Sequence, residues 1–315
     1  MHTMKTKLIK RWRQLFDKDL GIPPTWLSHE YDLDCLVLAQ AETFLTADYV
    51  RQCRHNRPSI PVIVSLTSYP ARMSELPYCL LSLWRQTVQP SDIYLWLAKS
   101  DLPQGMSDLP SAVCLFVEHG LHIEWVDDDK QYKKLAPALQ RFPHTVIVTA
   151  DDDVFYRPDW LAKLWHSYQK NHQAVHAHRV HRVGWMQDKH VTTYQAWQHR
   201  LTDNSRRYDN LATGVGGILY PPQIMSEQAT DMTLARQLCP TNDDLWWWAM
   251  TVLANHQIQV AKNPYPDPIY LNPKREQQPQ LGETLASVNV GKCANDKQMS
   301  ALLDYFPQLK QKAQR

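Results

Sequence analysis

The segment from Thr145 to Tyr156 constrains the fold of this chain more than any other, because consecutive acids follow a short apolar run. Five of the six residues from Thr145 to Ala150 are β-branched, which is typical of a buried β-strand. The three acids Asp151–Asp153 follow at once. In open α/β sheets ligands bind at the carboxyl ends of the strands, and Mg²⁺ or Mn²⁺ prefers oxygen ligands. The segment therefore predicts a strand that ends in a metal or ligand site.

An acidic surface turn is the alternative interpretation of the same triplet. Pro158 and Asp159 favour the start of a helix shortly after it, and an acidic turn before a helix needs no metal. Adjacent carboxylates repel one another unless a cation or several hydrogen-bond donors compensate them. The position of the triplet directly after a predicted buried strand favours the ligand site.

The composition is that of a globular protein without a strong basic field. Hydrophobic residues make up 43% of the 315 residues and charged residues 21%, so the chain can bury a large core. The formal net charge is +2, and composition therefore provides no argument for nucleic acid as a partner. The length suits one large domain with elaborations or two smaller ones.

The cysteines and the hydropathy pattern indicate a cytoplasmic protein. The six cysteines are far apart and show no paired spacing such as Cys-x-x-Cys, which fits reduced thiols in a cytosolic protein. No stretch approaches the roughly 18 uninterrupted apolar residues of a membrane span. The N-terminus lacks the apolar core of a signal peptide.

Residues 4–16 have the pattern of a basic amphipathic helix, with apolar residues at helical spacing and lysines and arginines between them. Such a helix can lie on an anionic membrane surface as a peripheral contact. It fits equally well a helix that packs on the body of the protein and exposes a basic face to solvent. The sequence leaves both alternatives open.

Strands and helices alternate through the first half of the chain. The expected strands span residues 62–67, 92–97, 122–126 and 145–150. The expected helices span residues 76–86, 130–139 and 160–169. The first strand, helix and strand predict parallel pairing with a right-handed crossover. The whole pattern predicts an α/β fold with a doubly wound sheet.

The second half carries less regular signals. Residues 174–183 predict one strand that contains His176, His178 and His181. Alternation along a strand places the first two on one face and the third on the other, which disfavours a zinc site. Arg179, His181 or Arg182 in the same segment is a candidate for contact with a phosphate or an acceptor, with satisfied structural side chains as the favoured alternative.

Two further segments are assigned by pattern. Residues 184–210 are polar and aromatic, and we expect a loop-rich insertion there, near a bound substrate. Residues 300–312 predict a single closing helix.

Four blocks of the sequence carry a family resemblance. They span residues 62–72, 125–135, 148–153 and 213–222. In this order they resemble a bacterial group of glycosyltransferases with the GT-A fold, related to family 2 and often found in surface-polysaccharide gene sets. The acids Asp151–Asp153 correspond to the Asp-x-Asp motif of that family. The resemblance implies a GT-A-like, doubly wound, mostly parallel central sheet with flanking helices and a smaller C-terminal acceptor region.

The resemblance also divides the chain. Residues 1–57 are expected to form an N-terminal helical extension, and residues 58–255 the catalytic domain. Within that domain the nucleotide-sugar half covers about 58–160 and the acceptor half about 161–255. Residues 256–315 are expected to form a C-terminal loop and a closing helix.

The resemblance implies a metal-dependent hexosyltransferase. Enzymes of this kind use a nucleotide-sugar donor, commonly a UDP-sugar, with Mn²⁺ or Mg²⁺ bridging the diphosphate. The metal offsets negative charge on the departing nucleoside diphosphate. The expected acceptor is a glycan or glycolipid in surface-polysaccharide, capsule or lipooligosaccharide synthesis, with inversion at the sugar. The expected location is cytoplasmic, with residues 4–16 as a peripheral contact to the inner membrane.

Site roles follow from the same resemblance. Asp153 is expected to bind the metal, and Asp151 to contact the metal or the ribose. The remaining donor-site candidates are Thr67, Tyr69 and Arg72 in the nucleotide pocket, Asp127 or Asp128 at the base, Lys133 or Lys134 at phosphate, and Gly216 and Gly217 beside the donor sugar. For the lysines the alternative is a solvated first turn of a helix, and for the glycines a sharp turn.

Asp243 and Asp244 are the candidates for a catalytic base. The resemblance places an acidic pair here, and one carboxylate would remove the proton of the acceptor hydroxyl as its oxygen attacks the anomeric carbon. Asp244 is the first choice and Asp243 the second. The alternative is a helix start at which Thr241 and Asp244 form a capping arrangement and the helix dipole favours the acids.

Two other functions compete with this interpretation. A nucleotidyl- or phosphotransferase also requires a metal, acids and lysines, but it leaves Asp244 without a clear role. A catalytically silent carbohydrate-binding protein would not need Asp153 for glycan binding.

Overall fold

The structure is a computed structural model that describes residues 38–55, 57–272 and 287–315. The expected amphipathic segment at residues 4–16 lies outside these ranges. Within them, no helix combines the length and the apolar character that crossing a membrane requires.

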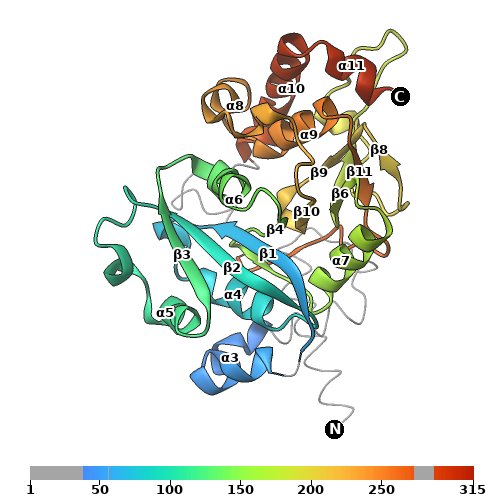
Figure 1. Cartoon of the computed structure of the whole chain (residues 1–315). Coiled ribbons are helices and arrows are strands. Elements are labelled where there is room, and N and C mark those ends of the chain that lie inside the picture. The colour runs from blue at the N-terminus through green and yellow to red at the C-terminus, as the bar shows by residue number, and fades with distance from the viewer. Residues whose placement is uncertain (1–37, 56, 273–286) are drawn as a thin grey trace.

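An eight-stranded sheet forms the centre of the molecule, in the order β3-β2-β1-β4-β10-β6-β11-β8 (Figure 1). Its strands are β1 (Ser59–Thr67), β2 (Gln89–Ala98), β3 (Leu121–Val126), β4 (Val146–Thr149), β6 (Ala174–Ala177), β8 (Arg206–Arg207), β10 (Ile218–Tyr220) and β11 (Gln257–Val260). β10 is antiparallel to β4 and β6, and β8 is antiparallel to β11, whereas all other pairs are parallel. The predicted α/β class with a mostly parallel central sheet is confirmed.

Helices cover both faces of the sheet and create two cores. One core contains side chains of α3 (Ala47–Arg54), α4 (Leu76–Trp84), α5 (Ser111–Val117) and α7 (Trp160–Lys170). The other contains side chains of α6 (Ala136–Arg141), α8 (Met232–Leu238), α9 (Asp243–Leu253), α10 (Ala294–Tyr305) and α11 (Gln308–Ala313). Alternate residues of β1 enter different cores, since Val62 and Val64 lie in the first and Ile63 in the second. Burial on both faces explains why β1 is almost uniformly apolar from Ile60 to Leu66.

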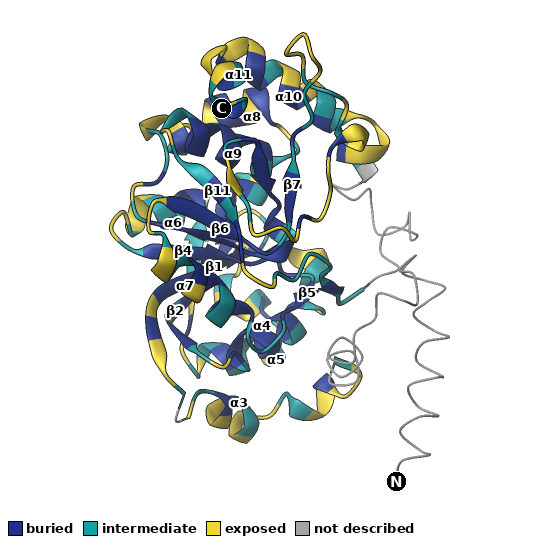
Figure 2. Ribbon diagram, turned by 90° about the vertical axis from the view of Figure 1, so that its right-hand side faces the viewer, coloured by how far each residue is buried: buried dark blue, intermediate teal, exposed yellow. Residues whose placement is uncertain are grey.

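Of the helices of the second core, α8, α9, α10 and α11 gather at one end of the molecule, at the top of Figure 1, and α6 lies below them. In Figure 2 the central strands and α9 have the dark blue of buried residues. The central sheet continues past residue 255, the expected end of the catalytic domain, because β11 pairs with β6. The sheet therefore draws on part of the segment that was assigned to the C-terminal loop.

The prediction of one strand at residues 174–183 is wrong. β6 ends at Ala177, and β7 (Val180–Arg182) pairs with β9 (Asn210–Ala212) in a separate two-stranded sheet. The chain leaves the central sheet at His178, whose ring nitrogens bond to the carbonyl of Trp160 at 3.0 Å and the amide of Tyr265 at 3.1 Å. Buried polar groups of this kind override the local strand pattern because they must find partners.

The prediction of one closing helix at residues 300–312 is also wrong. α10 ends at Tyr305 and α11 begins at Gln308. Pro307 separates them, because proline disfavours helical backbone at the preceding residue, and Phe306 has φ −118° and ψ 74°. The two helices pack on α9.

Smaller elements complete the fold. β5 (Val154–Phe155) pairs with β12 (Ile269–Tyr270), directly after the acidic triplet. The helix predicted from Lys130 begins instead as a 3-10 turn, η5 (Lys130–Lys134), and only then continues as α6. The cluster of glycines forms the 3-10 turn η7 (Gly214–Gly216) before β10.

Candidate active site

Three loops meet where parallel strands of the sheet end. Residues 68–72 follow β1, residues 127–134 follow β3, and Asp151–Asp153 follow β4. The carboxyl ends of parallel strands lie at one edge of a sheet, which is the usual ligand position in α/β proteins. The N-terminus of α9 reaches the same edge, because its first residue Asp243 lies beside Lys134 of η5.

The central acid of the triplet points inward. Asp152 accepts a hydrogen bond of 2.5 Å from the Ser68 hydroxyl and lies 3.3 Å from the Arg72 guanidinium. Burial raises the pKa of Asp152 to about 7, although Arg72 opposes this shift. The side chains of Asp151 and Asp153 are 26% and 21% exposed, so these two acids face the open edge.

Arg72 compensates two of the acids. It forms ion pairs with Asp152 and Asp153, and its Nε donates to the hydroxyl of Tyr69 at 3.4 Å. The ring of Tyr69 is 40% exposed beside this guanidinium. The predicted nucleotide-pocket residues Tyr69 and Arg72 thus lie at the triplet. Thr67 donates its hydroxyl to the carbonyl of Trp96 at 2.7 Å and joins the ends of β1 and β2.

Lys134 connects the triplet with α9. Its ammonium lies 2.9 Å from Asp151 and 3.4 Å from Asp243, and the residue is buried. Burial lowers the pKa of Lys134, but Asp151, Asp243 and Asp244 outweigh burial and hold this pKa well above its usual range. The ammonium therefore remains charged and binds acids from both halves of the expected catalytic domain.

The capping arrangement that was the alternative interpretation of Thr241 and Asp244 does not form. The N-cap of α9 is Asn242, whose side chain accepts from the amide of Leu245 at 3.3 Å. Thr241 lies one residue too early to cap, and its hydroxyl contacts Asn289 at 2.6 Å. The acids Asp243 and Asp244 occupy the first turn of α9, where the helix dipole favours negative charge.

The two acids of α9 have different partners. Asp243 accepts from the indole of Trp247 at 3.1 Å, and Asp244 accepts from the amide of Gly214 at 3.0 Å. Burial raises the pKa of Asp244 to about 8, Asp243 adds to this rise, and Lys134 opposes it. A carboxyl group whose pKa lies near neutral pH suits general base catalysis.

Glycine is required at the turn beside this acid. A Cβ on Gly214 would lie 2.5 Å from the Lys134 ammonium and 3.2 Å from Asp244. Gly217 has φ +88°, and a Cβ there would lie 2.4 Å from the ring of Trp160. A Cβ on Gly216 would lie 2.5 Å from Arg179, so close packing already accounts for both predicted glycines. Their contact with a donor sugar stays a prediction.

The loop after β3 contains a compact ion cluster. Asp128 forms ion pairs with Lys130 and Lys133. Burial raises the pKa of Asp128, but hydrogen bonds from Lys130 and Lys133 outweigh burial and lower this pKa to about 2. Lys133 is only 4% exposed, whereas Asp127 is exposed at the loop surface. Of the two lysines predicted to approach phosphate, Lys134 lies beside Asp151 of the site, whereas Lys133 forms an ion pair with Asp128.

Sequence reasoning missed Ser68 and Gly214 as members of the site. Ser68 directly follows the residue that ends β1, and a hydroxyl at that position was the signal that could have indicated it. Gly214 opens the glycine cluster, but only the tertiary contact with Asp244 shows that its amide is the donor.

The residues present fit a divalent ion that is shared with a bound substrate. Among the described residues, no three His, Cys, Asp or Glu side chains converge to hold a metal by themselves. Asp151 and Asp153 offer two carboxylates at the open edge, and Mg²⁺ commonly binds one or two carboxylates together with substrate phosphates. Arg72 and Lys134 compensate the same acids in the structure.

No family model and no curated protein match this chain. Among solved structures, S. aureus TarS 1-349 in complex with UDP is similar at 14% identity and TM-score 0.41, over 67% of this chain and 59% of that chain. The mannosyltransferase PcManGT from Pyrobaculum calidifontis, in complex with GDP-Man and Mn²⁺, is similar at 12% identity and TM-score 0.40, over 77% of this chain and 69% of that chain. CMP:2-keto-3-deoxy-manno-octonic acid synthetase complexed with CTP is similar at 10% identity and TM-score 0.34, over 64% of this chain and 88% of that chain. Likeness at this level carries no argument about the reaction, which has to come from the site.

Proposed function

We propose that this protein is a metal-dependent glycosyltransferase that moves a hexose from a nucleotide-sugar donor, a UDP-sugar, to a hydroxyl of a glycan or glycolipid. One observation carries the proposal: Lys134 joins an acid at the end of β4 to an acid at the start of α9. A donor-binding edge and a candidate base thus belong to one site.

The donor half of this mechanism is electrostatic. Asp153 and Asp151 would hold Mn²⁺ or Mg²⁺, which supplies positive charge to the departing nucleoside diphosphate when it is bound. Arg72 and Lys134 lie beside these acids and add cationic charge at the same edge. Tyr69 offers an exposed ring for stacking on a nucleoside base.

The acceptor half depends on Asp244. Its carboxylate accepts the acceptor hydroxyl proton as the oxygen forms a bond to the anomeric carbon and the bond from that carbon to the diphosphate breaks. Attack from the side opposite the diphosphate inverts the configuration. The Gly214 amide orients this carboxylate, and Asp243 with Lys134 sets its charge environment.

The biological setting follows from the same proposal. We assign residues of about 58–160 to the donor and about 161–255 to the acceptor, in a catalytic domain that is flanked by residues 1–57 and 256–315. The product would belong to a bacterial surface polysaccharide or lipooligosaccharide. The site would act at the cytoplasmic face of the inner membrane, with residues 4–16 as the peripheral contact.

A thermal-shift panel tests the donor site. Wild type, Asp153→Ala and the control Asp304→Ala would be melted with UDP, GDP, CTP and UDP-sugars, with and without Mn²⁺. Asp304 is a matched acid because its side chain is 78% exposed. A ligand bound only by the native state raises the midpoint of unfolding.

The proposal expects a Mn²⁺-dependent shift with UDP or a UDP-sugar that Asp153→Ala loses and Asp304→Ala keeps. A shift with CTP and none with UDP, GDP or the UDP-sugars would favour a nucleotidyltransferase. Absence of any nucleotide shift in wild type would overturn the proposal.

A further inference from the structure

A cavity of about 620 Å³ is lined by residues of the expected acceptor half together with Pro266, Asp267 and Val290 of the C-terminal segment. Arg179 between β6 and β7, Tyr194 of η6 (Tyr194–Ala196), and His199 and Arg200 contribute to its wall, as does Asp267. None of these residues belongs to the acidic triplet or to the loop after β3. The wall of the cavity therefore does not include the acids and lysines of the proposed donor edge.

Arg179 brings an unpaired charge to this cavity. Its Nη1 donates to the Thr213 hydroxyl at 2.9 Å, while its Nε is buried without a hydrogen-bond partner. Among the residues that the structure describes, no carboxylate forms an ion pair with it. A buried charged donor without a partner costs free energy, so this arrangement favours an incoming anion.

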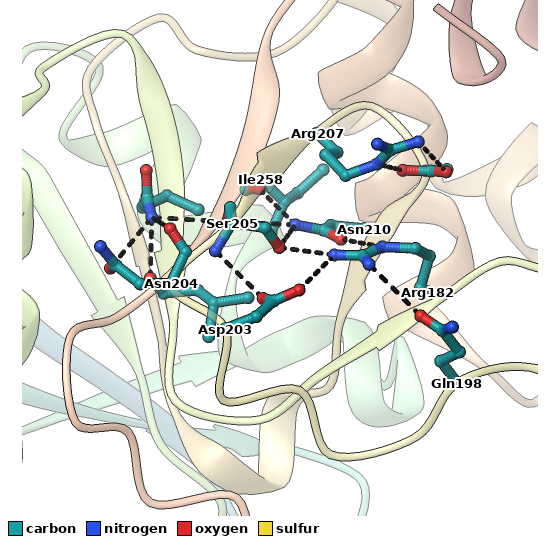
Figure 3. A network of polar contacts seen from close by, with 11 residues as sticks. Arg182, Gln198, Asp203, Asn204, Ser205, Arg207, Asn210 and Ile258 are labelled. Carbon is teal, nitrogen blue, oxygen red and sulfur yellow. Dashed lines mark hydrogen bonds and ion pairs between the residues drawn. The ribbon is translucent and has the colours of Figure 1, made fainter.

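Arg182, three residues later, shows the opposite arrangement. Its guanidinium lies 2.8 Å from Asp203 and 2.6 Å from the Ser205 hydroxyl, and it also donates to Asn210 and Gln198 (Figure 3). This network fixes the loop between β7 and β9. The guanidinium of Arg182 thus has hydrogen-bond and ion-pair partners within the protein, whereas the Nε of Arg179 has no hydrogen-bond partner.

The wall of the cavity is positively charged. Arg200 forms an ion pair with Asp267 at 3.0 Å, and the Arg179 charge therefore has no counterpart in the wall. Burial lowers the pKa of His199, and Arg179 and Arg200 lower it further, so His199 stays neutral. A neutral imidazole and the Tyr194 hydroxyl can hydrogen-bond to a sugar.

The cavity lies close to the candidate base. Thr213, which bonds to Arg179, precedes Gly214, whose amide bonds to Asp244. An acceptor bound in the cavity would therefore lie next to the carboxylate that takes its proton.

We propose that this cavity binds the acceptor through an anionic group, a phosphate or a carboxylate, and that Arg179 is the residue that recognises it. This inference rests on the proposed function and gives it a substrate class: acceptors that carry an oxyanion near the reacting hydroxyl. The guanidinium suits the role because its planar donors match the oxygens of carboxylates and phosphates.

Binding of defined probes tests the inference. Glucose 6-phosphate, glucuronate and glucose would be titrated by ligand-observed NMR into protein saturated with UDP and diamagnetic Mg²⁺, so that the donor edge is occupied. Wild type should bind at least one anionic probe more tightly than glucose, and the two anionic probes distinguish phosphate from carboxylate. Arg179→Ala should weaken the affinity for the preferred anion roughly tenfold to a hundredfold, which is the effect of losing one charged hydrogen-bonding partner. The affinity for glucose should not change.

Three further variants separate recognition from folding. Arg179→Lys keeps the charge and should retain part of the anion affinity, and Thr213→Val removes the Arg179 bond but should retain the preference for anions. Arg141→Ala is the matched control, because that arginine is 50% exposed and pairs with Glu124.

Equal binding of glucose and both anions in wild type, or undiminished anion binding in Arg179→Ala, would overturn the inference. Failure of UDP to bind would instead overturn the proposed function.

Discussion

The ammonium of Lys134 lies 2.9 Å from the carboxylate of Asp151. The two residues come from different loops, since Lys134 ends the turn η5 and Asp151 follows β4. Asp243 of α9 lies 3.4 Å from the same ammonium. Lys134 therefore balances the charge of acids from both segments, whereas Arg72 pairs with Asp152 and Asp153.

Replacing Lys134 by methionine should strongly destabilise the protein. The change leaves buried acids without their cation, and the loss of one partner of a buried ion pair costs about 3–5 kcal/mol. Lys130→Met is the control, because the Lys130 side chain is 70% exposed and should contribute less than about 1 kcal/mol. Urea unfolding of both variants measures the two losses, and equal losses would contradict the central role of Lys134.

Asp244→Asn should separate activity from stability. The amide oxygen can still accept from Gly214, but the variant lacks a base, so turnover should fall by roughly 10²- to 10⁴-fold. Release of nucleoside diphosphate from the donor measures this loss. In wild type the rate should rise with pH and level off near the pKa of about 8. An Asn variant with wild-type turnover would exclude Asp244 as the base.

The same substitution should stabilise the protein in alkaline buffer. The folded-state pKa of Asp244 is about 8, above the ordinary value of 3.8, so the folded protein binds this proton more tightly than the unfolded chain. Stability from this group is complete at low pH and is lost as pH rises towards 8. The side chain of the Asp244→Asn variant does not ionise, so the variant does not lose stability in this way. Its thermal midpoint at pH 8.5 should therefore exceed that of wild type. A lower midpoint at pH 8.5 would refute the assigned pKa.

Gly217→Ala should destabilise the turn beside the site. The backbone has φ +88°, and the new Cβ would lie 2.4 Å from Trp160, so we expect a loss of roughly 1–3 kcal/mol or more. Gly291→Ala is the matched control, since nothing lies within 4 Å of its Cβ position. Chemical unfolding should show a clear loss for the first variant only.

His178→Gln should reduce the sensitivity of stability to acid. Burial lowers the pKa of His178 to about 4 from 6.5, although its bond to the Trp160 carbonyl opposes this shift. The unfolded chain therefore binds the proton first, and stability falls as pH drops from 6.5 to about 4. The variant should be less stable at pH 7 but should lose about 3 kcal/mol less than wild type on acidification.

Unfolding midpoints between pH 7 and 4 measure the two slopes. His190→Gln serves as the control, because that side chain is 69% exposed. Parallel slopes for wild type and His178→Gln would contradict the prediction.

The parallel half of the fold was predictable from the sequence. The strands expected at residues 62–67, 92–97, 122–126 and 145–150 correspond to β1, β2, β3 and β4. β1 and β4 are rich in β-branched residues and buried on both faces, and polar loops follow the strands, so local pattern and tertiary environment agree. The positions of Asp151 and Arg72 at strand ends followed from the same pattern.

The second half was less predictable because distant contacts determine it. His178 ends a strand by bonding to groups of α7 and of the segment before β12. Pro307 divides a segment whose apolar spacing fits one helix. Thr241 is a residue type that often caps helices. Its hydroxyl instead hydrogen-bonds to the side chains of Asn289 and Gln298, and Asn242 is the N-cap of α9.

Local sequence pattern is enough to predict the alternation of strands and helices, the edge at which acids collect and the chemical kinds of side chain available there. These depend on local periodicity and on the residue that follows each strand. Three relationships depend on how the chain packs: Lys134 lies between Asp151 and Asp243, Asp244 accepts from the amide of Gly214, and the Nε of Arg179 has no hydrogen-bond partner. Such pairings join residues far apart in the chain, and the packing of α9 and the loops against the sheet selects them.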